Sequence, residues 1–182
     1  MKVISVNVGL PRIVEYRGQP VATGIFKSPV EGKVEVGQLN LSGDRQADLR
    51  VHGGPAKSVY VYPSEHYPFW RVELPDSDLQ WGVFGENLTI EGLLETEVRP
   101  GDSLRIGTAE FAVTIPRYPC YKLGIRFGRK DIIRRFALSG RCGFYLSVVA
   151  TGEIEAGDPI EFTPAGEGTT ISEIFAERMG TR

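Results

Sequence analysis

Frequent turn residues divide this chain into short apolar stretches, and this pattern limits its fold more than any other feature of the sequence. The 182 residues include 22 glycines and 12 prolines, which interrupt helices and end strands. The stretches between them have strand lengths and alternating polarity. They are residues 2–7, 21–25, 32–36, 104–107, 110–115 and 143–149. The sequence therefore predicts a mainly β fold, a β-barrel of many short strands with a few short helices.

Helical patterns are few. Residues 64–72 follow a proline, and Ser64 can serve as the N-cap of a short helix. Residues 131–138 place three apolar side chains at helical spacing. The tail, residues 169–182, begins an amphipathic helix that can dock on the barrel, meet another subunit or fray. We predict one barrel domain over residues 1–168, followed by this short helical tail.

The charge balance argues against a protein that binds nucleic acids or membrane surfaces. The chain carries 21 basic and 23 acidic residues, for a formal net charge of −2, whereas such binders usually show a basic excess. The N-terminal stretch is too short and polar for a signal peptide, and no run reaches the roughly 20 apolar residues of a membrane-spanning helix. The only two cysteines, Cys120 and Cys142, are expected as reduced thiols of a cytoplasmic protein, with a disulfide between them as the alternative.

The stretch around Cys120 is the leading candidate for a reactive site. Residues 116–122 end an apolar strand and begin a helical pattern, and Arg117 and Lys122 lie on either side of the cysteine. Nearby cations favour the thiolate, the reactive form of cysteine. The alternative interpretation is a buried and unreactive thiol.

Two glycines mark a second candidate, the loop of residues 51–58. His52, Gly53, Gly54 and Lys57 lie there. Glycines allow a backbone to approach a ligand closely, and a lysine can bind an anion. The loop matches neither a P-loop nor a dinucleotide fingerprint, so a simple turn is the alternative.

Two further loops carry polar residues beside glycines. Glu86 and Asn87 follow a glycine turn, where they can contact a ligand or hydrogen-bond to the backbone. Arg141 lies between a helical pattern and a strand and can contact an anion, whereas Cys142 beside it is expected to be structural. Both loops therefore remain candidates for ligand binding.

Histidine chemistry has weaker support. The two cysteines and two histidines lack the close pairs of a zinc site. A cysteine–histidine hydrolase would need His52 or His66 beside Cys120, and sequence distance does not decide this. His66 lies among aromatic residues, which favours a packing role.

Taken together, the ordered motifs resemble the MOSC domain, named after the C-terminal domain of molybdenum cofactor sulfurases. Within that family the chain looks like the stand-alone bacterial proteins of the YiiM and YuaD kind. The resemblance covers nearly the whole chain, and the order of the motifs is more specific than any one of them. The matching segments are residues 52–60, 62–67, 85–89, 101–102, 116–123, 126–129, 139–141, 143–145 and 157–158.

The resemblance implies a MOSC-type β-barrel and a molybdenum cofactor, molybdenum bound to a molybdopterin, with Cys120 as the protein ligand to the metal. A soft thiolate suits such a sulfur-rich centre. The resemblance also implies that basic residues of the matching loops neutralise the phosphate of the pterin. These are Lys57, Arg117, Lys122 and Arg141, and the loop residues His52, Gly53, Gly54, Glu86 and Asn87 complete the implied cofactor site.

The implied activity is an oxidoreductase that reduces N-hydroxylated compounds, such as hydroxylamino-purines, with Cys120 in the catalytic centre. This role predicts a small-molecule substrate and a separate electron-donor reductase; a homodimer is possible. One alternative is a sulfur carrier with a persulfide on Cys120, and another is a non-catalytic cofactor-binding module. No pyridoxal phosphate is expected.

Two departures from the family pattern are visible. Many relatives have proline where this chain has Cys142, and longer relatives continue into further C-terminal helices. The resemblance therefore leaves open whether a partner docks through such helices.

Overall fold

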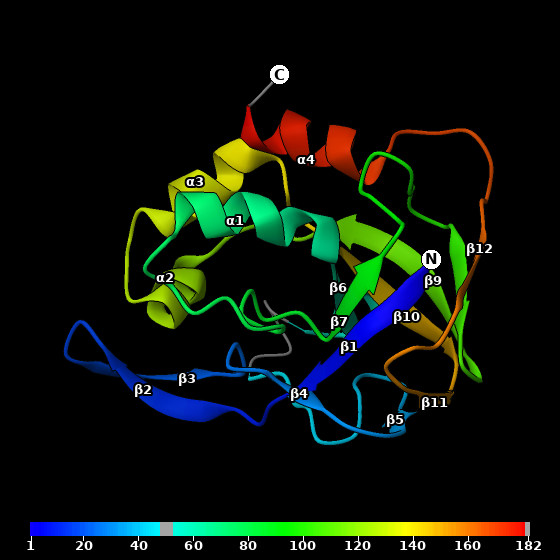
Figure 1. The fold of residues 1–182 in the computed structure, drawn as a ribbon, viewed down its shortest axis with the longest axis horizontal. Coiled ribbons are helices and arrows are strands. Elements are labelled where there is room, and N and C mark those ends of the chain that lie inside the picture. Colours follow the sequence, from blue (N-terminus) through cyan, green and yellow to red (C-terminus); the bar gives the residue numbers. More distant parts are fainter. Residues whose placement is uncertain (48–52, 181–182) are drawn as a thin grey trace.

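Eight short strands form one strongly curled sheet, which agrees with the predicted mainly β fold (Figure 1). The structure, a computed structural model, describes residues 1–47 and 53–180. The strand order is β12-β8-β9-β10-β6-β7-β1-β4, and β6 and β7 are its parallel pair. The strands are β1 (Lys2–Val8), β4 (Ser28–Val30), β6 (Val59–Pro63), β7 (Leu88–Glu91), β8 (Ser103–Ile106), β9 (Ala109–Pro116), β10 (Phe144–Ala150) and β12 (Ile160–Thr163).

The sheet is mainly β as predicted, but its described strands do not close into a continuous barrel. The paired strands of the described chain end at β4 and β12. Near the open edge, β1 contacts the segment before β12 through an isolated bridge between Lys2 and Pro159 and a hydrogen bond from the Val3 N–H to the Asp158 carbonyl, 2.9 Å. Pro159 has no N–H to donate, and Gly157 adopts a positive φ of 97°. Two more hydrogen bonds join the same segments, from the Gly157 N–H to the Val3 carbonyl at 2.8 Å and from the Ile160 N–H to the Met1 carbonyl at 3.2 Å, but β1 and β12 do not form a regular ladder.

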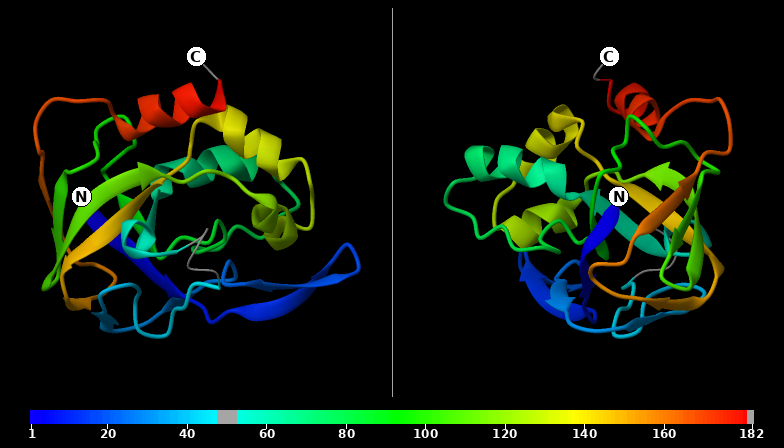
Figure 2. Two further views of the ribbon diagram at one scale, coloured as in Figure 1. Left: turned by 180° about the vertical axis from the view of Figure 1, so that it is seen from behind. Right: turned by 45° about the vertical axis from the view of Figure 1, so that its right-hand side comes forward.

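Two small sheets accompany the main one. Strands β5 (Val34–Val36) and β11 (Gly152–Ile154) pair below it, and β2 (Arg12–Tyr16) and β3 (Gln19–Thr23) form a hairpin that projects beneath helix α2 (Tyr121–Phe127) (Figures 1 and 2). Arg17 and Gly18 at its tip have φ angles of 55° and 73°, as a tight two-residue hairpin turn requires.

Short helices cover one side of the sheet (Figure 2). The predicted helix at residues 64–72 is present as a 3₁₀ turn followed by α1, but Ser64 makes no capping hydrogen bond because Pro63 takes the cap position. The helix predicted from residue 131 is also present. The bounds are η1 (Pro55–Lys57), η2 (Ser64–His66), α1 (Tyr67–Glu73), α2 (Tyr121–Phe127) and α3 (Ile132–Ser139).

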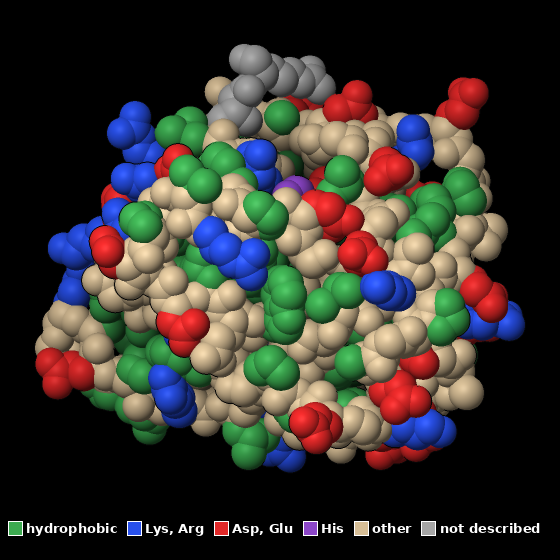
Figure 3. All heavy atoms as spheres, viewed as in Figure 1, with side chains coloured by type: hydrophobic (Ala, Val, Ile, Leu, Met, Phe, Trp, Pro, Cys, Tyr) green, Lys and Arg blue, Asp and Glu red, His purple; other side chains and the backbone are tan. Residues whose placement is uncertain are grey.

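Basic side chains gather at the molecular edge formed by α2 and α3 (Figure 3). Part of this charge is neutralised locally. Asp131 accepts hydrogen bonds from Arg129 and Arg135, and Arg135 also pairs with Glu73 at 2.7 Å. These ion pairs connect the start of α3 with the end of α1.

The tail docks on the main sheet. Helix α4 (Ile171–Met179) buries Ile171 and Phe175, and the Phe175 ring stacks on Tyr118 with 5.8 Å between centroids. Thr170 and Glu173 form a reciprocal capping box at its start. Of the three outcomes left open by the sequence, docking is the one observed.

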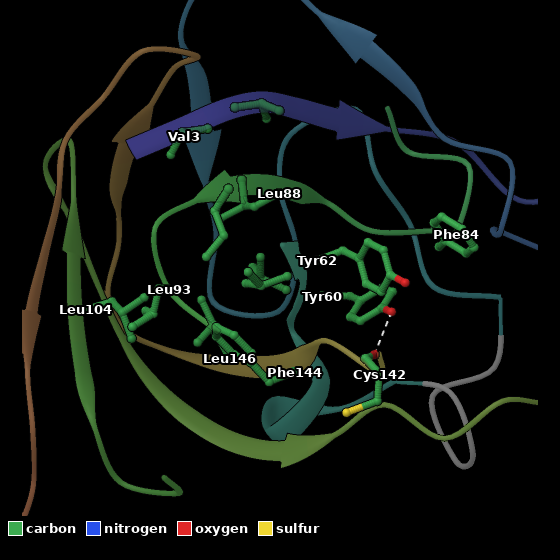
Figure 4. Packing of buried hydrophobic residues seen from close by; sticks show 14 of the residues in the cluster. Val3, Tyr60, Tyr62, Phe84, Leu88, Leu93, Leu104, Cys142, Phe144 and Leu146 are labelled. Carbon is green, nitrogen blue, oxygen red and sulfur yellow. Dashed lines mark hydrogen bonds between the residues drawn. The ribbon is translucent and has the colours of Figure 1, made fainter. Parts of the chain in front are cut away.

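Aromatic rings fill the space between the sheet and the helices. Tyr62 packs against Phe84 at 4.7 Å, and the indole of Trp70 donates a hydrogen bond of 2.6 Å to the Tyr62 hydroxyl. Figure 4 shows Tyr60 and Tyr62 side by side, with the Tyr60 hydroxyl donating to the carbonyl of Cys142 at 2.8 Å. This core fixes β6 and the start of β10 behind the candidate site. No helix among the described residues is long and apolar enough to span a bilayer.

Candidate functional site

Cys120 lies between the end of β9 and the first residue of α2. Its backbone is extended, with φ −134° and ψ 173°. Arg117 and Tyr118 before it and Lys122 in the first turn of α2 line the same pocket as Cys120. Cys120 is a free, partly exposed thiol. The strand-to-helix junction predicted from the sequence therefore presents the sulfur to a cavity.

The pocket contains about 670 Å³ of space, part of it open to solvent. Segments far apart in the sequence form its wall. Its charged and polar lining residues are Thr23, Lys27, Asp44, Arg45, Gln46, Lys57, Tyr60, Asn87, Arg117, Tyr118, Cys120, Lys122 and Tyr145. Five of these carry positive charge and one carries negative charge, so the pocket favours an anionic ligand.

Arg117 is the most deeply buried cation of the wall that faces Cys120. Only 5% of its surface is exposed, and its guanidinium lies 4.7 Å from the centre of the Phe136 ring. Burial by itself lowers the pKa of Arg117. The electrostatic interactions with Tyr60, Tyr145 and Cys120 outweigh this effect, so the pKa of Arg117 is raised. Among the described residues, its terminal NH1 nitrogen has no hydrogen-bond partner. A buried donor of this kind is costly unless a ligand accepts from it.

Two tyrosines hold Arg117 in place. The Tyr60 ring lies 5.5 Å from the guanidinium, and the Tyr145 ring packs 5.2 Å from Tyr60. Burial raises the pKa of both hydroxyls, so both remain neutral at physiological pH. They surround the guanidinium without cancelling its charge, and Arg117 stays available to an anion.

A buried ion pair forms another part of the wall, and the sequence patterns did not identify it. The Lys27 ammonium donates to Asp44 at 2.5 Å, and the Asn87 amide donates to the other oxygen of Asp44 at 2.9 Å. Burial lowers the pKa of Lys27, and Asp44 opposes this effect. Lys27 follows an apolar stretch and Asp44 follows a turn glycine. Neither position carries a signal that distinguishes it from a solvent-exposed charge.

The glycine loop reaches the pocket through its lysine. Lys57 lines the cavity, whereas Gly53 and Gly54 are not part of the lining. The Gly54 N–H donates to the side chain of Gln46 at 3.2 Å, and Gln46 donates to the carbonyl of Lys57 at 2.6 Å. Gln46, which the sequence analysis missed, thus fixes this loop. His52 lies outside the described residues.

Glu86 does not reach the pocket. It is fully buried and accepts hydrogen bonds from the N–H groups of Gly82 and Phe84 and from the hydroxyls of Tyr67 and Thr89. Burial raises its pKa. Its geometry is that of a buried support for the turn, and it brings no atom to the place where a ligand would bind.

Arg141 also lies away from the pocket. Its guanidinium stacks on Phe69 at 3.9 Å and donates to the carbonyl of Ser139 at 3.0 Å. The sequence predicts that Arg141 contacts an anion, whereas in the structure its guanidinium makes a cation–π contact with the Phe69 ring. The structure therefore unites Lys57, Asn87, Arg117, Cys120 and Lys122 but not Glu86 or Arg141.

The second thiol and the described histidine belong to the core. Cys142 is fully buried, and burial raises its pKa, with the charge of Glu95 adding to the effect. The ring of His66 lies 2.8 Å from Glu95, and Glu95 accepts from the N–H of Gly143. His66 therefore pairs with a carboxylate behind the sheet and does not line the pocket of Cys120.

Comparisons with known proteins identify the family. The model of the MOSC domain matches residues 48–161. The uncharacterized protein YflK of Bacillus subtilis is 44% identical over 177 residues, 97% of this chain and 79% of that protein. A protein named reductase from Gibberella moniliformis is 35% identical over 146 residues, 79% of this chain but 26% of the fungal protein.

A solved structure gives the same result for the fold. The crystal structure of YiiM from Geobacillus stearothermophilus superposes with a TM-score of 0.80 at 32% identity, over 98% of this chain and 83% of that chain. The chain belongs to the MOSC domain family.

Proposed function

We propose that this protein binds a molybdenum–pterin cofactor through Cys120 and reduces N-hydroxylated compounds. The observation that carries the proposal is the pairing of a free cysteine with a buried arginine, Arg117, whose terminal nitrogen has no partner within the described chain. Membership of the MOSC family and a relative named reductase support the same class of function.

The residues of the pocket fit such a group. A thiolate is a soft ligand suited to molybdenum, and the two sulfurs of the pterin leave the protein to supply only one. The phosphate of the pterin needs positive charge and hydrogen-bond donors. Lys57, Arg117 and Lys122 supply the charge, and the unpaired NH1 of Arg117 supplies a buried donor.

Each of these residues then has a separate task. Cys120 would hold the metal from its position between the end of β9 and the start of α2. The Tyr60 ring and Tyr145 orient Arg117 toward the bound anion. Lys122, only 8% exposed, adds charge in a place that excludes most water.

When bound, the cofactor supplies the two-electron chemistry that protein side chains lack. The overall reaction converts R–NH–OH, two electrons and two protons into R–NH₂ and water, as the N–O bond breaks. A separate donor protein would supply the electrons. The chain itself would position the substrate and limit the access of water to the reacting atoms.

Metal and pterin analysis tests the proposal directly. The wild type, Cys120→Ser and Cys142→Ala are purified from a host that makes the cofactor. We expect molybdenum and pterin in near-equal amounts in the wild type and in Cys142→Ala, and loss of molybdenum in Cys120→Ser. Absence of both from the wild type, or equal molybdenum content in all three proteins, contradicts the proposal.

Activity and sulfur content complete the test. With a chemical reductant, the loaded wild type should convert a hydroxylamino-purine to the amine, and Cys120→Ser should not. Intact-protein mass spectrometry of the wild type after incubation with a cysteine desulfurase distinguishes sulfur transfer. A persulfide on Cys120 without any amine product would favour a sulfur carrier instead.

A further inference from the structure

Three polar side chains form a rigid and nearly solvent-free part of the pocket wall. Lys27, Asp44 and Asn87 all line the cavity, and their exposed fractions are 9%, 4% and 4%. Asp44 accepts from Lys27 at 2.5 Å, from Asn87 at 2.9 Å and from the N–H of Gly9 at 3.0 Å. The backbone N–H of Tyr60 donates a hydrogen bond of 3.1 Å to the side-chain oxygen of Asn87. Such a fully supported set presents a fixed geometry to a ligand.

Part of the hydrogen-bonding capacity of this wall is unused. An ammonium has three N–H donors, and within the described chain Asp44 is the acceptor found for Lys27. Two donors on a side chain that is nine-tenths buried are therefore left for a ligand. A carboxylate has about four acceptor sites, and three are occupied on Asp44. The wall thus offers a donor and an acceptor next to each other.

The charges indicate that the group bound here is uncharged. Asp44 compensates Lys27, and the buried Glu86 also acts on this lysine. Arg117, in contrast, interacts with Tyr60, Tyr145 and Cys120, and no carboxylate pairs with it in the described part of the chain. An anion therefore gains most at Arg117. A neutral group with both donor and acceptor atoms suits Lys27 and Asp44.

We propose that Lys27 and Asp44 bind the edge of an uncharged nitrogen heterocycle. Lys27 donates to a ring nitrogen or carbonyl oxygen, and Asp44 accepts from the adjacent N–H. A pterin and a purine both carry such an edge, so the heterocycle can belong to the cofactor or to the substrate. The inference deepens the proposed function and rests on it in placing the ligand in this pocket.

Binding to the metal-free protein tests the assignment without any catalysis. The probes are 6-hydroxymethylpterin, adenine and inorganic phosphate, titrated by calorimetry into the wild type, Lys27→Met and Arg117→Met. Lys27→Met should raise the dissociation constant of the heterocycle about tenfold or more, as expected for a lost hydrogen bond to a charged donor. The same variant should change the dissociation constant of phosphate less than about twofold. Arg117→Met should weaken the binding of phosphate and leave the binding of the heterocycle nearly unchanged. Lys33→Met is the matched control, since Lys33 pairs at the surface with Glu153.

A measurement on the wild type guards against a variant that fails to fold. The side-chain amide signals of Asn87, which donates to Asp44, should shift in NMR spectra on addition of the heterocycle but not of phosphate. Binding of the pterin assigns the wall to the cofactor, and binding of adenine assigns it to the substrate. The proposal is overturned if neither heterocycle shifts these amide signals. It is also overturned if Lys27→Met lowers the affinity for phosphate as much as the affinity for the heterocycle. Neither result depends on molybdenum content, so the two proposals fail separately.

Discussion

At the residue scale, the two cysteines show how position determines chemistry. Cys120 faces a pocket with several cations, whereas Cys142 lies in the core with 0% exposure and a pKa raised by burial. A thiol reacts through its thiolate and only where a reagent can reach it. The two residues are identical in kind, but only Cys120 is partly exposed and lines the pocket.

Alkylation should separate the two thiols. In the folded protein we expect iodoacetamide to modify Cys120 and leave Cys142 unmodified, because only Cys120 is partly exposed. Peptide mass spectrometry after timed labelling measures both rates. Unfolded protein should be labelled at both positions and is the internal control, while rapid labelling of Cys142 under native conditions would refute this assignment.

At the scale of single elements, the turn from Gly82 to Thr89 depends on one buried carboxylate. Burial raises the pKa of Glu86 above the usual value of about 4.3. The native state then keeps a proton at pH values where the unfolded chain has lost it. The free energy of unfolding that Glu86 contributes is therefore complete below about pH 4.3 and is lost as pH rises through the native-state pKa.

Glu86→Gln tests this sign. The amide has one oxygen for the N–H groups of Gly82 and Phe84, so the variant should be less stable than the wild type throughout. The difference in the free energy of unfolding between the wild type and the variant should narrow from pH 5 to pH 8, since only the wild type loses stability as the Glu86 carboxyl ionises. Urea unfolding of both proteins at each pH measures this difference. A difference that widens with pH would show that the native pKa is lowered.

Helix α4 depends in a similar way on its capping box. Thr170→Ala removes the side-chain oxygen that accepts from the N–H of Glu173 at 3.2 Å, which should lower the free energy of unfolding by about 1 kcal/mol. Amide hydrogen exchange should rise in the first turn of α4. Thr169→Ala, at an exposed neighbouring position, should change neither measurement, and an equal effect of both variants would argue against the cap.

At the scale of the whole molecule, local patterns in the sequence predicted the elements well. Strands at residues 2–7 and 143–149 and the helix from residue 131 are confirmed as β1, β10 and α3, because alternation and helical spacing are local properties. The mainly β fold is confirmed, but the described strands do not form a closed barrel. Contact between β1 and the start of β12 consists of an isolated bridge at Pro159 and a few hydrogen bonds, and it joins distant parts of the chain that no local pattern connects.

The candidate site was predictable where the residues form a motif. Cys120, Arg117 and Lys122 belong to one continuous segment, so their meeting follows from a single strand-to-helix junction. Lys27, Asp44 and Gln46 reach the pocket from separate loops, and no local signal connects them. Arg141 stacks on Phe69, which comes from helix α1, and no local signal in the sequence indicates this contact.

The docked tail bears on whether residues 1–168 form an independent domain. Ile171 and Phe175 are buried to 0% and 1% exposure, and each such side chain contributes about 1.5–3 kcal/mol. Ending the chain after residue 168 should therefore lower the free energy of unfolding by about 3–6 kcal/mol. Urea denaturation of both forms checks this, with the Thr169→Ala protein as the full-length control. Unchanged stability would mean that the main sheet does not need the tail.

The open ladder of the main sheet has a consequence for aggregation. An unpaired edge strand can recruit a strand from a neighbouring copy. Here one edge strand, β4, has only three residues with Pro29 in its centre, and the other, β12, lies between Pro159 and Pro164. Proline lacks the N–H that an added strand would need, and edge prolines discourage such growth. The sheet therefore stays open without offering a long edge on which fibrils could extend.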